Sequence, residues 1–269
     1  MGILNVTPDS FSDGGEFLST KQAVERGSEL IADGADILDI GAESTRPGAA
    51  AVSAEIQTER VVPVIVAIRH ENPTVVISVD TRLALVARAA LGVGADMIND
   101  TSALRDDSEM CGVIADAGAA VVLMHRKGTP LTMQQDGGPM YADVLKEILD
   151  FLQERRDFAV AAGIPAAKIL LDPGLGFGKR FEHNLSIMRH FDRFFELGQP
   201  MVLGASRKTF IGQITGVTAP NERDAGSLAS AMHGMNFAHQ YPSAVLILRV
   251  HEVKGTTQAV QVLKSLQSG

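Results

Sequence analysis

Short apolar runs that stop abruptly on a polar or charged residue recur along the whole chain. Such continuous runs of Val, Ile and Leu are typical of strands buried on both faces, as parallel strands are when helices cover them. Eight runs alternate with helix-length segments, and the seven intervals from Asn5 to Arg249 average about 35 residues. This spacing predicts an α/β fold, a single-domain (β/α)8 TIM barrel over residues 1–269. The predicted strands are 1–5, 37–39, 76–80, 97–100, 121–125, 169–172, 201–203 and 246–251.

Helical periodicity fills most of the gaps between these runs. Ser19 or Thr20 is the expected cap of the first helix, and Gly34 can end it. Pro63 falls inside the helical stretch 54–69, where we expect a kink or a restart. The other predicted helices are 83–90, 109–117, 141–162, 222–239 and 254–267.

Two connections are longer than a barrel requires. Residues 6–15 follow the first strand and residues 41–51 follow the second, and both are rich in Gly, Ser or other small residues. In a barrel both would lie at the face that carries the active site. Long loops in this position are usually lids or binding loops, and the alternative is that they are plain connectors.

Composition narrows the class of protein. The 269 residues carry a formal net charge of −8, which argues against nucleic acid or an anionic membrane as a partner. No apolar run approaches the roughly 20 residues of a membrane helix, and no basic start followed by an apolar core indicates a secretory signal. The single cysteine, Cys111, is expected to be a small buried hydrophobe. We therefore expect a cytoplasmic enzyme.

Several common motifs are approached but not met. Residues 174–179 look like a phosphate-binding loop, but Pro173 and Arg180 stand where that loop needs Gly and Ser or Thr. Residues 204–208 carry Lys where a nucleophile elbow needs Gly. No His-Glu-x-x-His motif or His/Cys cluster predicts a zinc site.

Polar residues at the strand ends remain as the candidate site. In a barrel they would meet at one rim: Asn5, Asp39, Asp80, Asn99, Asp172, Lys208, Arg249 and His251. Any single aspartate could instead cap a helix or form a structural ion pair, and Asp80 with Thr81, or residues 100–102, could be caps. His125 alone is better explained as a structural histidine. Eight strand ends that all carry polar residues favour a functional rim.

The charges at this rim fall into two groups. Cations come from consecutive late strand ends, near the place where barrel enzymes often bind phosphate; they are Arg207, Lys208, Arg249 and His251. Asp80, Asn99 and Asp172 come from the middle strands, and a carboxylate can accept two parallel hydrogen bonds from one edge of a heterocycle. The rim therefore predicts a nitrogen heterocycle at the floor of the site and an anion above it.

These strand ends, in chain order, match one family. Residues 1–15 resemble the opening signature of dihydropteroate synthases, and seven later segments resemble that family's motifs. They are 43–48, 78–81, 98–100, 124–125 with 128–130, 172–174 with 176–179, 206–208 and 249–251. The resemblance spans essentially the whole chain.

The resemblance implies a reaction in folate synthesis. Family members join 4-aminobenzoate to 6-hydroxymethyl-7,8-dihydropterin diphosphate with Mg²⁺, giving 7,8-dihydropteroate and diphosphate. Diphosphate leaves first, and the arylamine attacks the resulting pterin cation. By the matched positions the catalytic residues would be Asp80, Asn99, Asp172, Lys208, Arg249 and His251, the first four holding the pterin and the last two the diphosphate. Asn5 would bind Mg²⁺, and the aminobenzoate side would be Thr45, Arg46, Pro47, Phe177, Ser206 and Lys208.

The resemblance also implies a homodimer. Helices 222–239 and 254–267 are the candidate contacts because small residues permit close approach: Ala225, Gly226, Ala229, Ala231 and Gly234. The nearest alternative function is a pterin-binding methyltransferase barrel that serves a corrinoid protein. Two further alternatives are a Schiff-base aldolase that uses Lys208, with Arg207 depressing its pKa, and a barrel without catalytic activity.

Overall fold

The computed structural model of the chain describes residues 1–7, 16–43, 51–128 and 139–267. Within these residues, eight strands form one sheet in which each strand pairs in parallel with the next along the chain. The strands are β1 (Gly2–Asn5), β2 (Ile37–Gly41), β3 (Val76–Asp80), β4 (Met97–Asp100), β5 (Ala120–Met124), β6 (Ile169–Asp172), β7 (Met201–Leu203) and β8 (Leu246–Leu248). A parallel bridge between Gly2 and Val250 joins the end of the sheet to its beginning. The predicted parallel barrel is confirmed.

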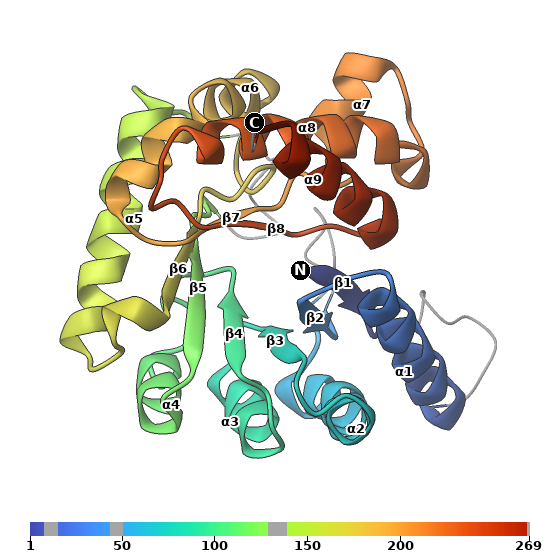
Figure 1. Cartoon of the computed structure of the whole chain (residues 1–269). Coiled ribbons are helices and arrows are strands. Elements are labelled where there is room, and N and C mark those ends of the chain that lie inside the picture. The colour runs from blue at the N-terminus through green and yellow to red at the C-terminus, as the bar shows by residue number, and fades with distance from the viewer. Residues whose placement is uncertain (8–15, 44–50, 129–138, 268–269) are drawn as a thin grey trace.

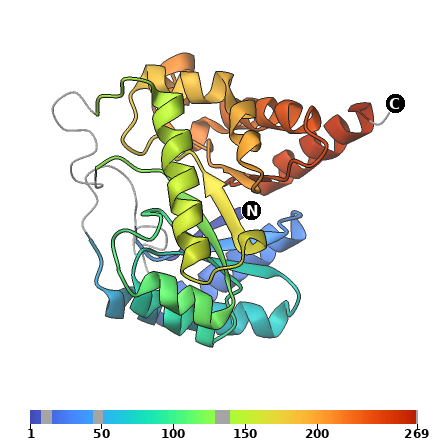
Figure 2. The same cartoon turned by 90° about the vertical axis from the view of Figure 1, so that its left-hand side faces the viewer.

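Helices surround the strands on the outside (Figures 1 and 2). Side-chain caps begin two of them, since Ser53 accepts the Ile56 amide and Asp143 accepts the Leu145 amide. The helices are α1 (Glu16–Ala32), α2 (Ala54–Glu71), α3 (Ala84–Gly92), α4 (Met110–Ala117), α5 (Val144–Ala161), α6 (Phe181–Arg189), α7 (Thr209–Thr215), α8 (Asp224–His239) and α9 (Val253–Gln267). Cys111 is buried on α4, as predicted.

The strands bury one face against the helices and the other face inside the barrel. Outward residues such as Leu38, Ile77 and Val121 belong to the core between the sheet and the helices. Inward residues form a separate apolar cluster inside the barrel: Met1, Met97, Val122, Leu170 and Val202, with Ile37, Ala120 and Ile247 packed against them. Successive side chains of a strand alternate between its faces, so residues two positions apart both point inward. The residue two positions after an inward apolar residue is often polar, as Asp39 is after Ile37. The inner apolar cluster therefore forms a floor beneath the polar strand ends.

Two helix details differ from the sequence expectation. Helix α1 begins at Glu16, so the prediction that Ser19 or Thr20 caps it is wrong. The sequence prediction relied on the apolar spacing from Ala23 onward, and that spacing does not locate the first residue of the helix. Helix α2 is continuous from Ala54 to Glu71, so no restart occurs at Pro63. Pro63 is exposed, which lets water satisfy the carbonyl group that lacks a helical partner.

The loop after β6 passes very close to the end of β5. Gly174 has φ +68° and Gly178 has φ +62°, both in the left-handed region that favours glycine. A Cβ at Gly174 would overlap the carbonyl oxygen of His125, and one at Gly178 would overlap that of Lys127. These two close approaches fix the loop that carries Phe177 against β5.

Substituting Gly174 by alanine should therefore destabilise the protein strongly. The left-handed φ and the overlap with His125 act together, and we expect a loss of about 3 kcal/mol or more in the free energy of unfolding. Gly216→Ala is the matched control, because Gly216 has φ +75° but no described atom lies within 4 Å of its added Cβ. The control should lose only about 1–2 kcal/mol in urea unfolding. Equal losses in the two variants would show that the overlap is relieved without cost.

Candidate active site

A cavity at the C-terminal ends of the strands contains half of the site residues expected from the sequence. Its lining is Asp80, Asn99, Thr101, Met124, Asp172, Gly174, Leu175, Phe177, Gly204, Lys208 and Arg249. Six of the predicted site residues therefore come together: Asp80, Asn99, Asp172, Phe177, Lys208 and Arg249. The cavity measures about 40 Å³, enough for a few water molecules, so a ring-sized ligand has to move part of its wall.

Among the remaining predicted residues that the structure describes, Asn5, Ser206 and His251 do not line this cavity. Asn5 is exposed at the end of β1, where its Oδ1 and the Asp80 side chain lie on the same side of Gly41. Ser206 and His251 form a pair, with Oγ and Nδ1 2.9 Å apart. Thr45, Arg46 and Pro47 lie outside the described residues, as do most of the two long loops.

Arg249 joins two carboxylates inside the barrel. Its Nε donates to Asp39 at 2.7 Å and its Nη2 donates to Asp80 at 2.9 Å. Asp39 also accepts hydrogen bonds from Ser78 Oγ at 2.7 Å and from Asn99 Nδ2 at 3.0 Å. Burying a charge costs several kcal/mol unless it is paired and hydrogen-bonded. This network is what allows charged groups to lie inside the barrel.

Two groups of the cavity have pKa values near neutrality. Burial raises the pKa of Asp80 to about 7, against the opposing effect of Arg249. Burial also lowers the pKa of Lys208 to about 8, and Arg249 lowers it further while Asp172 and Asp80 raise it. The Lys208 ammonium lies 4.1 Å from the centre of the Phe177 ring, within the range of a cation–π contact. Perturbed pKa values gathered in one cavity are typical of functional sites.

Asp172 faces Lys208 from the end of β6. Burial raises the pKa of its carboxyl, while the Gly174 amide, which donates to Oδ1 at 2.6 Å, and the Lys208 charge both lower it. The amide at Gly174 occupies one oxygen, Oδ1. Oδ2 lies 3.7 Å from the ideal Cβ position of Gly204, which also lines the cavity. Asp172 therefore has an oxygen on the cavity side that can accept hydrogen bonds from a ligand.

Two members of the predicted cation cluster do not act as cations in the cavity. Arg207 pairs with Asp224 through two hydrogen bonds of 2.7 and 2.9 Å and is not part of the lining. Its φ of +59° turns the backbone between Arg207 and Lys208, which the bare sequence does not reveal. Burial lowers the pKa of His251 to about 3, and the charges of Arg207, Arg249 and Lys208 contribute to this shift. His251 is therefore neutral at pH 7 and serves as a hydrogen-bonding group.

The structural explanations considered for three other residues agree with the contacts. Asp100 accepts two backbone amides of the turn that follows β4, at 2.7 and 2.8 Å. Thr81 accepts an amide at the start of α3. His125 is buried, and its Nδ1 lies 2.9 Å from the Lys179 ammonium. Asp80 differs from them, since its side chain bonds Arg249 and not a helix amide.

Some residues of the cavity were missed from the sequence. Thr101, Met124 and Leu175 line it but were not proposed as site residues. Met124 is the last residue of β5, but it is apolar and the strand-end rule selects polar residues. Thr101 and Leu175 lie in turns that the rule does not cover. Asp39 was placed at the rim but given no role, although it binds two of the proposed site residues.

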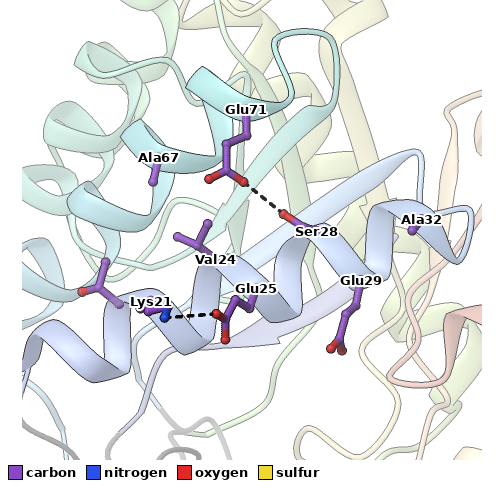
Figure 3. A pocket seen from close by; sticks show the side chains of 9 residues that line it. Lys21, Val24, Glu25, Ser28, Glu29, Ala32, Ala67 and Glu71 are labelled. Carbon is purple, nitrogen blue, oxygen red and sulfur yellow. Dashed lines mark hydrogen bonds and ion pairs between the residues drawn. The ribbon is translucent and has the colours of Figure 1, made fainter.

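A much larger hollow lies elsewhere, between α1 and α2 on the outside of the barrel (Figure 3). It measures about 770 Å³, and none of the predicted site residues lines it. Its polar side chains pair with one another, as Ser28 does with Glu71 and Lys21 with Glu25. This hollow is larger than the cavity at the strand ends, but the convergent charges and the perturbed pKa values lie in the smaller cavity, which we therefore take as the candidate active site.

Comparison with known proteins bears directly on the chemistry of this cavity. The model of the family described as pterin binding enzyme matches residues 1–251. A dihydropteroate synthase of Escherichia coli (strain K12) is 45% identical over 269 residues, covering 100% of this chain and 91% of its own. The chain belongs to the dihydropteroate synthase family. The family resemblance of the strand-end motifs is thereby confirmed.

Solved structures of the family share the whole fold. The dihydropteroate synthase of Xanthomonas albilineans with 4-aminobenzoic acid superimposes with a TM-score of 0.90 at 43% identity, covering 100% of this chain and 93% of the other. The same species' enzyme in complex with 7,8-dihydropteroate gives a TM-score of 0.87 at 41% identity over the same shares. In the part of the chain that the structure describes, no helix combines the length and apolar character needed to cross a membrane.

The titration of Asp80 provides a test of the site electrostatics. Its folded pKa of about 7 lies above the ~3.9 of an unfolded aspartate, so folding disfavours the charged form. The contribution of this group to stability therefore falls as pH rises from about 4 to about 7. We expect carboxyl ¹³C NMR of the ligand-free protein to show an Asp80 midpoint near 7, and Arg249→Met to move it higher. A midpoint below 5 would contradict this account.

Proposed function

We propose that this chain condenses 4-aminobenzoate with 6-hydroxymethyl-7,8-dihydropterin diphosphate, giving 7,8-dihydropteroate and diphosphate. The observation that carries the proposal is the cavity in which Asp80, Asn99, Asp172 and Lys208 converge, in a member of the dihydropteroate synthase family. Relatives that share its fold have been solved with 4-aminobenzoic acid and with 7,8-dihydropteroate.

The cavity suits a flat heterocycle with N–H donors on its edge. The carboxylates of Asp80 and Asp172 accept hydrogen bonds, and Lys208 supplies a donor and a positive charge between them. Buried acceptors discriminate strongly, because a ligand without matching donors leaves them unpaired. In the proposed role these residues orient the pterin with its reactive methylene toward the rim.

The rim would handle the leaving group. When the bond between the methylene carbon and the diphosphate oxygen breaks, its electron pair leaves with the diphosphate, and charge builds up on that oxygen. Arg249 supplies a positive charge there, and neutral His251 supplies a hydrogen-bond donor. The arylamine nitrogen then bonds to the methylene carbon and loses a proton. An aromatic amine needs no strong base for this step, which suits a cavity built from carboxylates, one amide and cations.

A divalent cation fits the exposed end of β1. The side chain of Asn5 makes no hydrogen bond to another described residue, so its amide oxygen can act as a ligand. The described residues contain no group of three His, Cys, Asp or Glu side chains arranged to hold a metal. Mg²⁺ often takes one or two protein oxygens and completes its shell with water and substrate phosphates. We propose Asn5 as that ligand, and bound Mg²⁺ would neutralise charge on the diphosphate.

The aminobenzoate side is proposed to lie on the Phe177 and Ser206 side of Lys208. The Phe177 ring and the Lys208 ammonium are already in contact, which offers an apolar face beside a cation for a benzoate. Ser206 lies next to His251 in the same region. Thr45, Arg46 and Pro47 remain predicted contributors from the second loop.

We also propose a homodimer in which α9, one of the two predicted contact helices, makes the main contact. Gly226 packs against Ile211 of α7, and Gly234 packs against Leu203 and Leu246, so these two glycines serve contacts within the chain. Exposed apolar residues instead lie on α9, where Val262 and Leu266 are 60% and 77% exposed. Light scattering at micromolar concentration measures the oligomeric state directly.

An assay of the wild-type protein tests the proposed activity. Pteroate formation should require both substrates and should fall when Mg²⁺ is chelated. Activity that persists without 4-aminobenzoate, or a methyl transfer to a corrinoid protein, would contradict the proposal. Borohydride with a carbonyl substrate should trap no adduct on Lys208, whose depressed pKa is the feature an aldolase would use.

Replacing Asp172 by asparagine should weaken pterin binding far more than aminobenzoate binding. The amide sets a donor where the carboxylate offered only acceptors, and one mismatched buried hydrogen bond costs roughly 1–3 kcal/mol, or about 5- to 150-fold in affinity. Calorimetry with 6-hydroxymethylpterin measures the loss. An unchanged pterin affinity would remove Asp172 from the proposed binding set.

A further inference from the structure

We propose that Asp39 is a positioning residue, which determines which atoms of Asn99 and Arg249 face the pterin. This inference rests on the proposed function and concerns how the same cavity selects its ligand. Asp39 does not line the cavity. It lies one layer deeper, on β2, and it acts through two residues that do line it.

Asp39 is completely buried, and its two oxygens receive three hydrogen bonds. The hydroxyl of Ser78 donates to Oδ1 at 2.7 Å. Asn99 Nδ2 and Arg249 Nε both donate to Oδ2, at 3.0 and 2.7 Å. The side chain has no exposed surface, while that of Arg249 is 20% exposed. A single carboxylate oxygen therefore holds one amide and one guanidinium of the cavity wall.

The contact with Asp39 decides which end of the Asn99 amide is free. An ionised carboxylate only accepts hydrogen bonds, so the amide must turn its nitrogen toward Asp39. The reversed amide would place its oxygen against a carboxylate oxygen, and the contact would lose its only donor, although Arg249 Nε would still donate to that carboxylate oxygen. Asn99 is therefore held with its carbonyl oxygen away from Asp39, and a ligand meets an acceptor at this position. Together with Asp80 and Asp172, this makes the heterocycle side of the cavity a surface of acceptors.

The same oxygen fixes the plane of the Arg249 guanidinium. With Nε on Asp39 and Nη2 on Asp80, the two carboxylates hold the fork from one edge. Nη1 is the nitrogen that neither carboxylate engages. In the proposed reaction, this leaves Nη1 for an oxygen of the diphosphate. Asp39 thus links the orientation of the pterin contact to that of the leaving-group contact.

Three variants separate this role from simple burial. Asp39→Leu removes both acceptor oxygens in a similar volume. Asp39→Asn keeps an oxygen for the two donors, because its NH₂ can turn toward the Ser78 hydroxyl, which is able to accept. Ser78→Ala removes only the third partner of Asp39. We expect Asp39→Leu to lose at least tenfold in affinity for 6-hydroxymethylpterin by calorimetry, while the other two stay within about threefold of wild type.

Steady-state kinetics adds a readout that a purely structural role would not give. In Asp39→Leu the KM for the pterin substrate should rise and kcat should fall, while the KM for 4-aminobenzoate stays unchanged, because Phe177 and Ser206 make no described contact with Asp39. Equal rises in both KM values, or a pterin affinity within threefold of wild type, would overturn the inference. A wild-type protein that neither binds the pterin nor forms pteroate would instead overturn the proposed function on which it rests.

A double variant covers the case in which Asp39→Leu does not fold. In Asp39→Asn with Ser78→Ala, the NH₂ loses its acceptor, and turning it sets a donor against Asn99 and Arg249. The loss in pterin affinity should then exceed the product of the two single losses by at least fivefold. Losses that simply multiply would show that the orientation of the residue 39 side chain does not matter, and would overturn the inference.

Discussion

The pairing of Arg249 with Asp39 and Asp80 is the interaction on which the rest of the site depends. A barrel interior is normally filled by apolar side chains, and this one is so filled at its floor. Above that floor, carboxylates and cations stand close together, and each is tolerated only because an opposite charge or a hydrogen bond compensates for lost hydration. The guanidinium spans two strands, so the positions of Asp39 and Asp80 are fixed relative to each other before any ligand binds.

The strand-end pattern predicted the fold and much of the cavity for one physical reason. In a parallel barrel all C-terminal ends meet, and runs buried on both faces are easy to recognise. Asp80, Asn99 and Asp172 were found because each ends such a run, and Lys208 because a short loop places it there. The same reasoning wrongly placed Arg207 among the cations of the cavity. Its backbone is in the left-handed region, and its side chain pairs with Asp224. A one-residue change of direction is invisible in a pattern of hydrophobicity.

Burial and protonation were the properties that the sequence could not supply. Lys208 and His251 were both counted as cations, yet their pKa values differ in effect. Lys208 keeps a pKa of about 8 because Asp172 and Asp80 oppose its desolvation. Burial, with nearby cations, lowers the pKa of His251 to about 3, so it is neutral at pH 7. The importance of Asp39 was hidden for a similar reason. Its partners come from residues 78, 99 and 249, and only the closed barrel brings those strands together.

These electrostatics also suit the proposed reaction, which needs no strong base. When the leaving group departs first, the protein must stabilise a pterin cation with carboxylates and the diphosphate anion with cations. The cavity holds groups of both kinds, since the carboxylates Asp80 and Asp172 line it together with the cations Lys208 and Arg249. Asp80 has a pKa of about 7, so near neutral pH it is ionised in part of the molecules and protonated in the rest. A positive charge on a ligand next to it would favour the ionised form. In the proposed reaction, the same carboxylate would both recognise the pterin and stabilise the positive charge that develops on it.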